Sequence, residues 1–150
     1  MRCVNVVLAA TLLGCVQSAN SPNDTDSAIV VTTGTYFGFC HGYCFSELTV
    51  DGQTLRFAET SRDPTQFPPR SRTLELSPAD RARIAALVDP GALAALEGIH
   101  GCPDCADGGG EWVQFRSGSD STRVTFEFGQ SLDPIAGLQA ELRTLRKRFQ

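Results

Sequence analysis

The stretch that decides the fold is CFSELTVDGQTLRFAE, residues 44–59. In FSELTV and again in TLRFAE, apolar side chains alternate with polar ones, which is the period of a half-buried β-strand. Asp51-Gly52 lies between them and is a strong hairpin signal, because both central positions of a two-residue turn require a positive φ. The sequence therefore predicts an antiparallel pair of strands, residues 44–51 with 53–59.

The same reasoning predicts a second hairpin in EWVQFRSGSDSTRVTFEFG, residues 111–129, with its turn at 118–120. AIVVTTGTYF, residues 28–37, is β-branched and aromatic and adds a further strand, whereas SRDPTQFPPRSR, residues 61–72, contains three prolines and is expected to be a loop. The residues of the second hairpin expected to face inward are Val113, Phe115, Val124, Phe126 and Phe128.

Three serine-proline or aspartate-proline pairs mark the starts of helices, at Ser77, Asp89 and Asp133. The first two begin short helices, of which the second is expected to stop at Gly98. The third begins a C-terminal helix whose apolar face comprises Ile135, Leu138, Leu142, Leu145 and Phe149. The predicted fold is α+β: an antiparallel sheet of four to five strands with two short middle helices and a C-terminal helix packed on one face.

The first residues, MRCVNVVLAATLLGC, predict export. Arg2 precedes an apolar run that is too short to span a bilayer, which needs about 20 residues, so we expect a secretory signal peptide over residues 1–14. The run ends in Leu12-Leu13-Gly14-Cys15, which resembles the lipobox of bacterial lipoproteins. That resemblance implies lipidation of Cys15, whose acyl chains would anchor the protein in the membrane of the cell envelope, facing the periplasm or the cell exterior.

Residues 15–27 are polar and cannot bury a core, so they are expected to be a flexible tether after the lipidated cysteine. Residues 28–150 have the size of one domain. After removal of Arg2 with the signal peptide, 12 basic side chains face 17 acidic ones, and no dense basic stripe is present. The composition therefore predicts no nucleic-acid partner, leaving the membrane and a possible envelope protein.

Four cysteines follow the tether, and export to an oxidising compartment predicts that they form disulfide bonds, with three possible connectivities. The cysteines are Cys40, Cys44, Cys102 and Cys105. A zinc site is the alternative, since CHGYC and HGCPDC together offer four thiolates and two imidazoles. The candidate ligands are Cys40, His41, Cys44, His100, Cys102 and Cys105. A thiol-redox role for Cys102-Pro-Asp-Cys105 is a further alternative, although a glycine-rich segment follows it instead of a helix.

Catalytic motifs do not accompany the two histidines: the sequence contains neither Gly-x-Ser-x-Gly nor His-Glu-x-x-His. It leaves enzymatic activity open and favours a non-catalytic domain without a cofactor. We therefore expect a binding or structural module of the envelope that acts through the loops around 40–44 and 102–107. Trp112 is a candidate recognition aromatic, with an edge-of-core position as the alternative.

Two motifs carry a wider resemblance. GFCHGYCFSELTVDGQTLRF, residues 38–57, and GCPDCADGGGEWVQF, residues 101–115, resemble a family of uncharacterised bacterial lipoproteins and exported proteins with a Cys-x-Gly-x-Cys segment before a strand. The resemblance spans roughly residues 34–146 and implies an α+β domain, with no catalytic residue to carry over. Members that have the first cysteine pair without the second would favour local pairing, Cys40 with Cys44 and Cys102 with Cys105.

Overall fold

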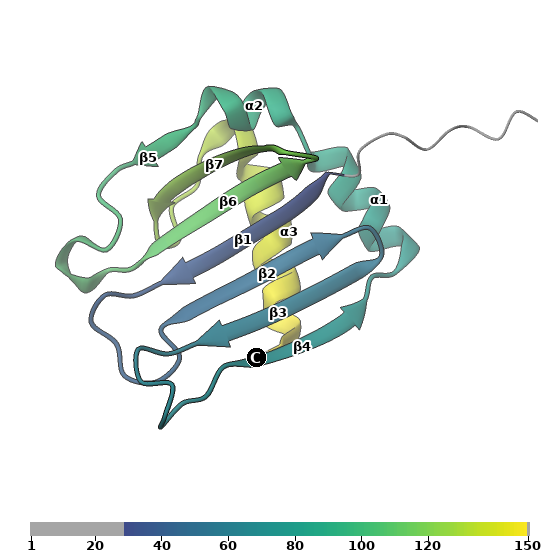
Figure 1. Cartoon of the computed structure of the whole chain (residues 1–150). Coiled ribbons are helices and arrows are strands. Elements are labelled where there is room, and N and C mark those ends of the chain that lie inside the picture. The colour runs from purple at the N-terminus through teal and green to yellow at the C-terminus, as the bar shows by residue number, and fades with distance from the viewer. Residues whose placement is uncertain (1–28, 150) are drawn as a thin grey trace, which may run out of the picture.

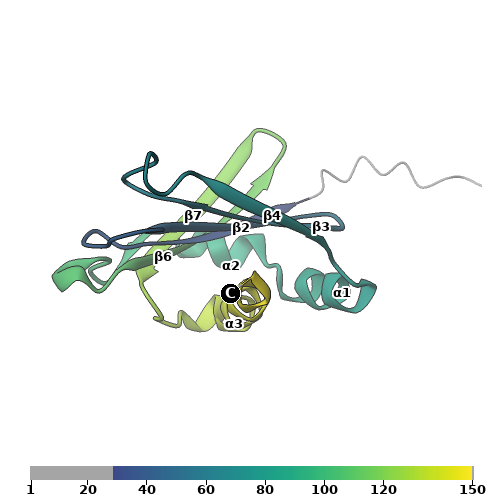
Figure 2. The same cartoon turned by 90° about the horizontal axis from the view of Figure 1, so that it is seen from below.

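A computed structural model describes residues 29–149 of the chain, which form a mixed α+β structure. Its centre is one sheet of seven strands, and the helices all lie against one face of this sheet (Figure 2). We call the opposite, helix-free face the open face. The predicted signal peptide, the lipidated Cys15 and the tether over residues 15–27 lie outside the described residues.

The strand β1 (Val30–Tyr36) lies in the middle of the sheet (Figure 1). On one side of it follow β2 (Phe45–Asp51), β3 (Thr54–Thr60) and β4 (Arg70–Glu75), and on the other β6 (Gly110–Ser117), β7 (Asp120–Glu127) and the short β5 (Gly98–His100). All neighbours are antiparallel except β5, which pairs in parallel with β7.

Both predicted hairpins are confirmed. Asp51 pairs with Thr54, so the turn between β2 and β3 is Gly52-Gln53, one position later than Asp51-Gly52; Gly52 has a positive φ of +55°, and Asp51 does not. In the second hairpin, Val113 and Phe115 pair across β6 and β7 with Val124 and Thr122, and Phe126 is fully buried. Phe128, predicted to face inward, is 50% exposed, because β7 ends at Glu127 and the strand alternation ends with it.

The predicted number of strands was too low, and the sheet is mixed instead of purely antiparallel. The strand β4 begins inside the segment 61–72 that was expected to be a loop and extends beyond it to Glu75. All six of its residues are exposed, so no apolar alternation marks it. Gly98, expected to stop a helix, begins β5, which has only three residues. These two strands form because β3 and β7 offer them backbone hydrogen bonds, a cause that no local pattern records.

The short helices begin where the sequence predicted. Ser77 accepts a hydrogen bond from the Asp80 backbone N–H at the start of α1 (Pro78–Leu87), and Asp89 accepts one from Ala92 at the start of α2 (Pro90–Ala95). Asp133 does not cap the last helix as predicted: it begins a 3-10 turn, η2 (Asp133–Ile135), that leads into α3 (Ala136–Arg146). A second 3-10 turn, η3 (Lys147–Phe149), follows.

The core lies between the sheet and these helices. All five apolar residues predicted for the C-terminal helix face are buried there, and they pack beneath β2, β3, β6 and β7. The face also carries charge, since Arg146 of α3 is only 7% exposed. Its guanidinium and that of Arg143 pair with Glu111 of β6, which is 2% exposed. An ion-pair network is therefore enclosed beside the apolar core.

Candidate functional site

Both cysteine pairs lie at the same end of the sheet. The last residue of β1, Tyr36, pairs with the first residue of β6, Gly110, so the loop 37–44 and the loop 101–109 lie side by side. We call this the loop end of the sheet; the loop 61–69 between β3 and β4 lies there as well. The sulfur atoms of Cys40 and Cys44 are at disulfide distance, as are those of Cys102 and Cys105, with Cα atoms 5.6 and 5.5 Å apart. The structure thus pairs neighbours in sequence and links neither hairpin to the other through sulfur.

Asp104 connects the two loops instead. Its Oδ1 accepts a hydrogen bond from the backbone N–H of Gly38, at 3.0 Å, and another from Gly109, at 3.1 Å. Asp104 itself has a positive φ of +64°, a left-handed conformation that costs free energy in a residue other than glycine. The two hydrogen bonds compensate this cost and hold the loop 101–109 against the loop 37–44.

The histidines are engaged away from the sulfur atoms. The His41 ring packs edge-on against Phe67, with centroids 5.0 Å apart, and His100 Nε2 lies 2.6 Å from the Leu96 carbonyl oxygen. Within residues 29–149, no group of three or more His, Cys, Asp or Glu side chains is arranged to hold a metal ion. The six candidate ligands are therefore not brought together, and this geometry does not support the zinc alternative.

The redox alternative also finds little support. Cys105 begins only a three-residue 3-10 turn, η1 (Cys105–Asp107), and not the longer helix whose N-terminus activates redox cysteines. The cysteines therefore lie in loops whose conformation they help to hold.

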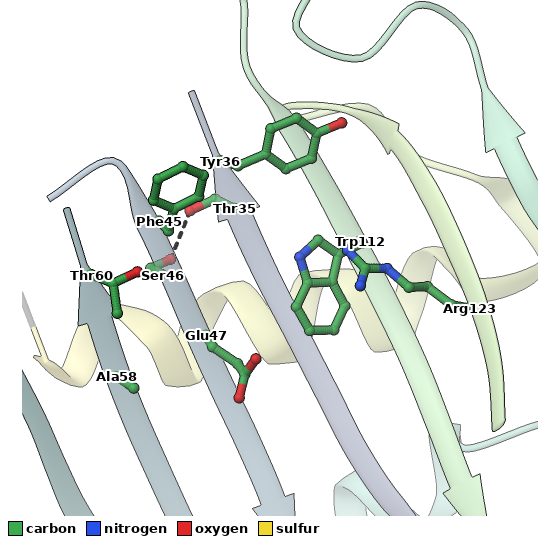
Figure 3. A pocket seen from close by; sticks show the side chains of 9 residues that line it. All are labelled: Thr35, Tyr36, Phe45, Ser46, Glu47, Ala58, Thr60, Trp112 and Arg123. Atoms are coloured by element: carbon green, nitrogen blue, oxygen red, sulfur yellow. Dashed lines mark hydrogen bonds between the residues drawn. The ribbon is translucent and has the colours of Figure 1, made fainter. Parts of the chain in front are cut away.

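A hollow of about 480 Å³ lies on the open face, next to the loop end (Figure 3). This volume falls in the range of small-ligand sites, about 300–1,000 Å³. Residues of β1, β2, β3, β6 and β7 surround it, so its shape depends on strands from both halves of the chain. The lining residues are Thr35, Tyr36, Phe45, Ser46, Glu47, Ala58, Thr60, Trp112 and Arg123.

Trp112 lies flat against the sheet, because its cross-strand neighbour is a glycine. Gly34 pairs directly with Trp112, and a Cβ atom at Gly34 would come within 2.5–2.6 Å of three atoms of the indole. On the other side of the indole, the Arg123 guanidinium carbon is 3.9 Å from the ring centroid. Trp112 is therefore held between backbone and guanidinium and is 9% exposed, although it lies on the open face.

Two further aromatic rings flank the hollow on the side of the loop end. Tyr36 lies over Gly110, where a Cβ atom would collide with the phenol ring, and thus repeats the arrangement of Trp112 over Gly34. Phe45 stands on the neighbouring strand, with the guanidinium of Arg62 5.2 Å from its ring centroid. The hollow therefore combines aromatic walls with an otherwise polar sheet surface.

Glu47 and Arg123 are the charged residues of the hollow. Neither side chain makes a hydrogen bond or an ion pair with another residue within 29–149; the contact of Arg123 is with the Trp112 ring. Partial burial lowers the pKa of Arg123, while the nearby Tyr36 and Glu47 act in the opposite direction. Two unlike charges thus face the same hollow with their hydrogen-bonding capacity unused by the protein.

Sequence reasoning located the cysteines and singled out Trp112, but it missed the hollow itself. Trp112 is buried, yet not at the edge of the core: it lies on the other side of the sheet. The site could have been found from the strand residues that point away from the core. Tyr36, Phe45 and Glu47 occupy such positions, between the residues that face the helices. That alternation points to one surface only after the strand order is known.

No protein-family model matches this chain, and no curated protein matches it. The family resemblance of the two cysteine motifs therefore stays a prediction. None of the helices formed within residues 29–149 has the length and apolar character needed to cross a bilayer.

Proposed function

We propose that this protein is a bacterial lipoprotein of the cell envelope: lipid on Cys15 anchors it to the membrane, and its disulfide-stapled, non-catalytic domain binds another envelope component. The signal-like residues 1–14 and the lipobox-like Leu12-Leu13-Gly14-Cys15 support the anchor. The cysteine pairs at disulfide distance support an oxidising compartment.

The position of the loop end supports a binding role away from the membrane. The described chain enters the sheet at Val30 and reaches the loop end at Tyr36, a strand length of about 20 Å. A tether attached before Val30 therefore leads to the opposite end of the sheet from the cysteine loops. On a lipid anchor, the loop end and the adjacent hollow would be free to meet other envelope components.

The observation that carries the binding role is the hollow with its two unpartnered charges, Glu47 and Arg123. Stacking on Trp112 holds the Arg123 guanidinium in place, and the structure shows no ion pair between it and Glu47. A guanidinium held on an aromatic ring, with N–H donors that no group among the described residues uses, is preorganised to bind a ligand. We therefore assign recognition to the hollow, with the loops 37–44 and 101–109 at its border.

The anchor is tested by Cys15→Ser in the full-length protein. We expect the variant to lose incorporation of a labelled fatty acid and to move from the membrane fraction to the soluble fraction, since no acyl chain can then be attached. Cys3→Ser is the matched control: it makes the same substitution inside the predicted signal peptide and should leave both readouts unchanged. A Cys15→Ser protein that still carries the labelled fatty acid would contradict the proposal.

The binding role is tested by photo-cross-linking in intact cells. A photoreactive amino acid at Thr60, which lines the hollow, is expected to give a discrete covalent adduct, visible on a gel or by intact mass. The same group at Ala85, exposed on α1 on the other face, should give none. The Thr60 adduct should weaken in Arg123→Gln. Equal labelling from both positions, or no adduct from Thr60, would count against the proposed function.

A further inference from the structure

We propose that the hollow binds a zwitterion of the amino-acid class, a ligand that carries an ammonium group and a carboxylate within one amino-acid or dipeptide unit. This inference rests on the proposed function, in which the hollow is the binding surface. It follows from the chemistry and spacing of Glu47 and Arg123 and from the walls around them.

Arg123 is suited to a carboxylate. A guanidinium presents a planar fork of N–H donors that matches a carboxylate oxygen pair, and it can use this fork while its face stays stacked on an aromatic ring. Here the guanidinium carbon of Arg123 lies 3.9 Å from the centroid of the Trp112 ring, and the indole in turn lies on Gly34. Because the guanidinium is already positioned, little side-chain entropy is lost when an anion binds.

Glu47 supplies the opposite charge. An ionised carboxylate only accepts hydrogen bonds, so a ligand that covers Glu47 has to bring donors, and an ammonium group brings three together with the complementary charge. Glu47 is partly buried and forms no ion pair with a side chain within residues 29–149; Arg123 attracts it only across the hollow. A purely anionic ligand on Arg123 would therefore meet repulsion from Glu47.

The spacing fits a small unit. Glu47 pairs across the strands with Gly34, the residue beneath the Trp112 ring on which the guanidinium rests. Arg123 itself stands on β7, with β1 and β6 between it and Glu47 on β2, but its guanidinium reaches back over the indole that covers Gly34, so the two charged groups face the same hollow. Consecutive Cα atoms in a peptide are 3.8 Å apart, so the charged ends of an amino acid or a dipeptide can reach both groups.

The walls distinguish this ligand from a neutral sugar. The hydroxyl groups of a sugar would give Glu47 and Arg123 only neutral partners. A zwitterion gives each of them a partner of opposite charge, and hydrogen bonds that involve ionised groups are roughly twice as strong as those between neutral groups. Tyr36, Phe45 and Ala58 then provide apolar surface for an aliphatic or aromatic side chain of the ligand (Figure 3). Unlike charges beside an apolar wall therefore select a zwitterion with an apolar side chain.

Trp112 is the single tryptophan of the sequence and lies in the hollow, so its fluorescence reports binding directly. The experiment titrates the full-length protein with alanyl-leucine, its N-acetyl derivative, its C-terminal amide and maltose, and repeats each titration by calorimetry. We expect alanyl-leucine to bind at least tenfold more tightly than either capped derivative and than maltose.

Two variants assign the ends of the ligand. Glu47→Gln should weaken binding of alanyl-leucine about tenfold and leave binding of the N-acetyl derivative unchanged, because that derivative has no ammonium group. Arg123→Gln should do the same for alanyl-leucine and leave the C-terminal amide unchanged. Arg56→Gln is the matched control, since Arg56 is exposed on β3 outside the hollow and its loss should alter none of the titrations.

The inference would be overturned if alanyl-leucine did not bind, if it bound no more tightly than its capped derivatives, or if maltose bound more tightly. It would also be overturned if Glu47→Gln and Arg123→Gln weakened binding of the capped derivatives as much as binding of alanyl-leucine. The Thr60 cross-link separates this failure from that of the proposed function. If the Arg123-dependent adduct persists while alanyl-leucine fails to bind, the ligand class is wrong and the binding role stands. If alanyl-leucine binds as expected and Thr60 gives no adduct, the hollow is a zwitterion site, and the proposed binding of another envelope component is wrong.

Discussion

Glu111→Ala is expected to lower the free energy of unfolding by about 3–5 kcal/mol, because it leaves a buried arginine without its counter-charge. Glu111 Oε2 lies 2.8 Å from Arg143 Nη2, and Oε1 lies 3.3 Å from Arg146 Nη2. Arg146 also donates to Thr33 Oγ1 at 3.0 Å, but a neutral hydroxyl cannot replace the carboxylate. Arg146 is only 7% exposed, so water cannot solvate its guanidinium in place of Glu111; the same burial lowers the pKa of Arg146.

Equilibrium unfolding in urea, followed by circular dichroism, measures this loss. Glu59→Ala is the matched control: it breaks the Glu59–Arg70 pair, in which the arginine side chain is 59% exposed, and should cost less than about 1 kcal/mol. Arg146→Met combined with Glu111→Ala should recover part of the stability, since it removes the charge that was left unpaired. A loss below about 1 kcal/mol in Glu111→Ala would show that the network is not enclosed as described.

Gly34→Ala is expected to cost about 2–3 kcal/mol, although it adds only one methyl group to a strand. The new Cβ would lie within 2.5–2.6 Å of the Trp112 indole, which cannot shift freely because Arg123 covers its other face. The indole has to leave the sheet, and its fluorescence maximum should move to longer wavelength as it meets water. The hollow would lose the support of Arg123 at the same time.

The collision is isolated by a double-mutant cycle. In a Trp112→Ala background the same Gly34→Ala change should cost nothing, because the ring that it would strike is gone. Gly91→Ala is the control for the chemical change itself: Gly91 is exposed in α2, a Cβ there meets nothing closer than 3.3 Å, and alanine favours helix. An unchanged Trp112 emission in Gly34→Ala would contradict the stacking.

Local patterns predicted the parts of the fold that bury one regular face. Strands β2 and β3 were predictable because apolar residues alternate up to the turn at Gly52, and α1 and α2 because Ser77 and Asp89 cap them in the way that their sequences suggest. The strand β4 could not be predicted in this way, since its residues are exposed and two prolines precede it. Its pairing with β3 gives it a structure that its own side chains do not specify.

The charged residues of the C-terminal helix show the same limit. Arg143 and Arg146 lie at the end of a helix, where cations favour the helix dipole and usually face solvent. Arg146 is instead buried, because Glu111, thirty-five residues earlier in sequence, lies opposite it on β6. The cysteines are the converse case: their short spacing within CHGYC and CPDC already permitted local pairing, and the structure adds their common position at the loop end.

The sequence by itself determined which segments have a face to bury, where the hairpins turn and where the first helices begin, because these depend on residues a few positions apart. Only the tertiary structure decided which strands are neighbours, and with that the ion-pair network of Glu111 and the hollow on the open face. Trp112 rests on Gly34, seventy-eight residues earlier in the chain, with Glu47 one strand beyond. Such contacts arise from strand order, which the hydrophobic period of a single segment does not encode.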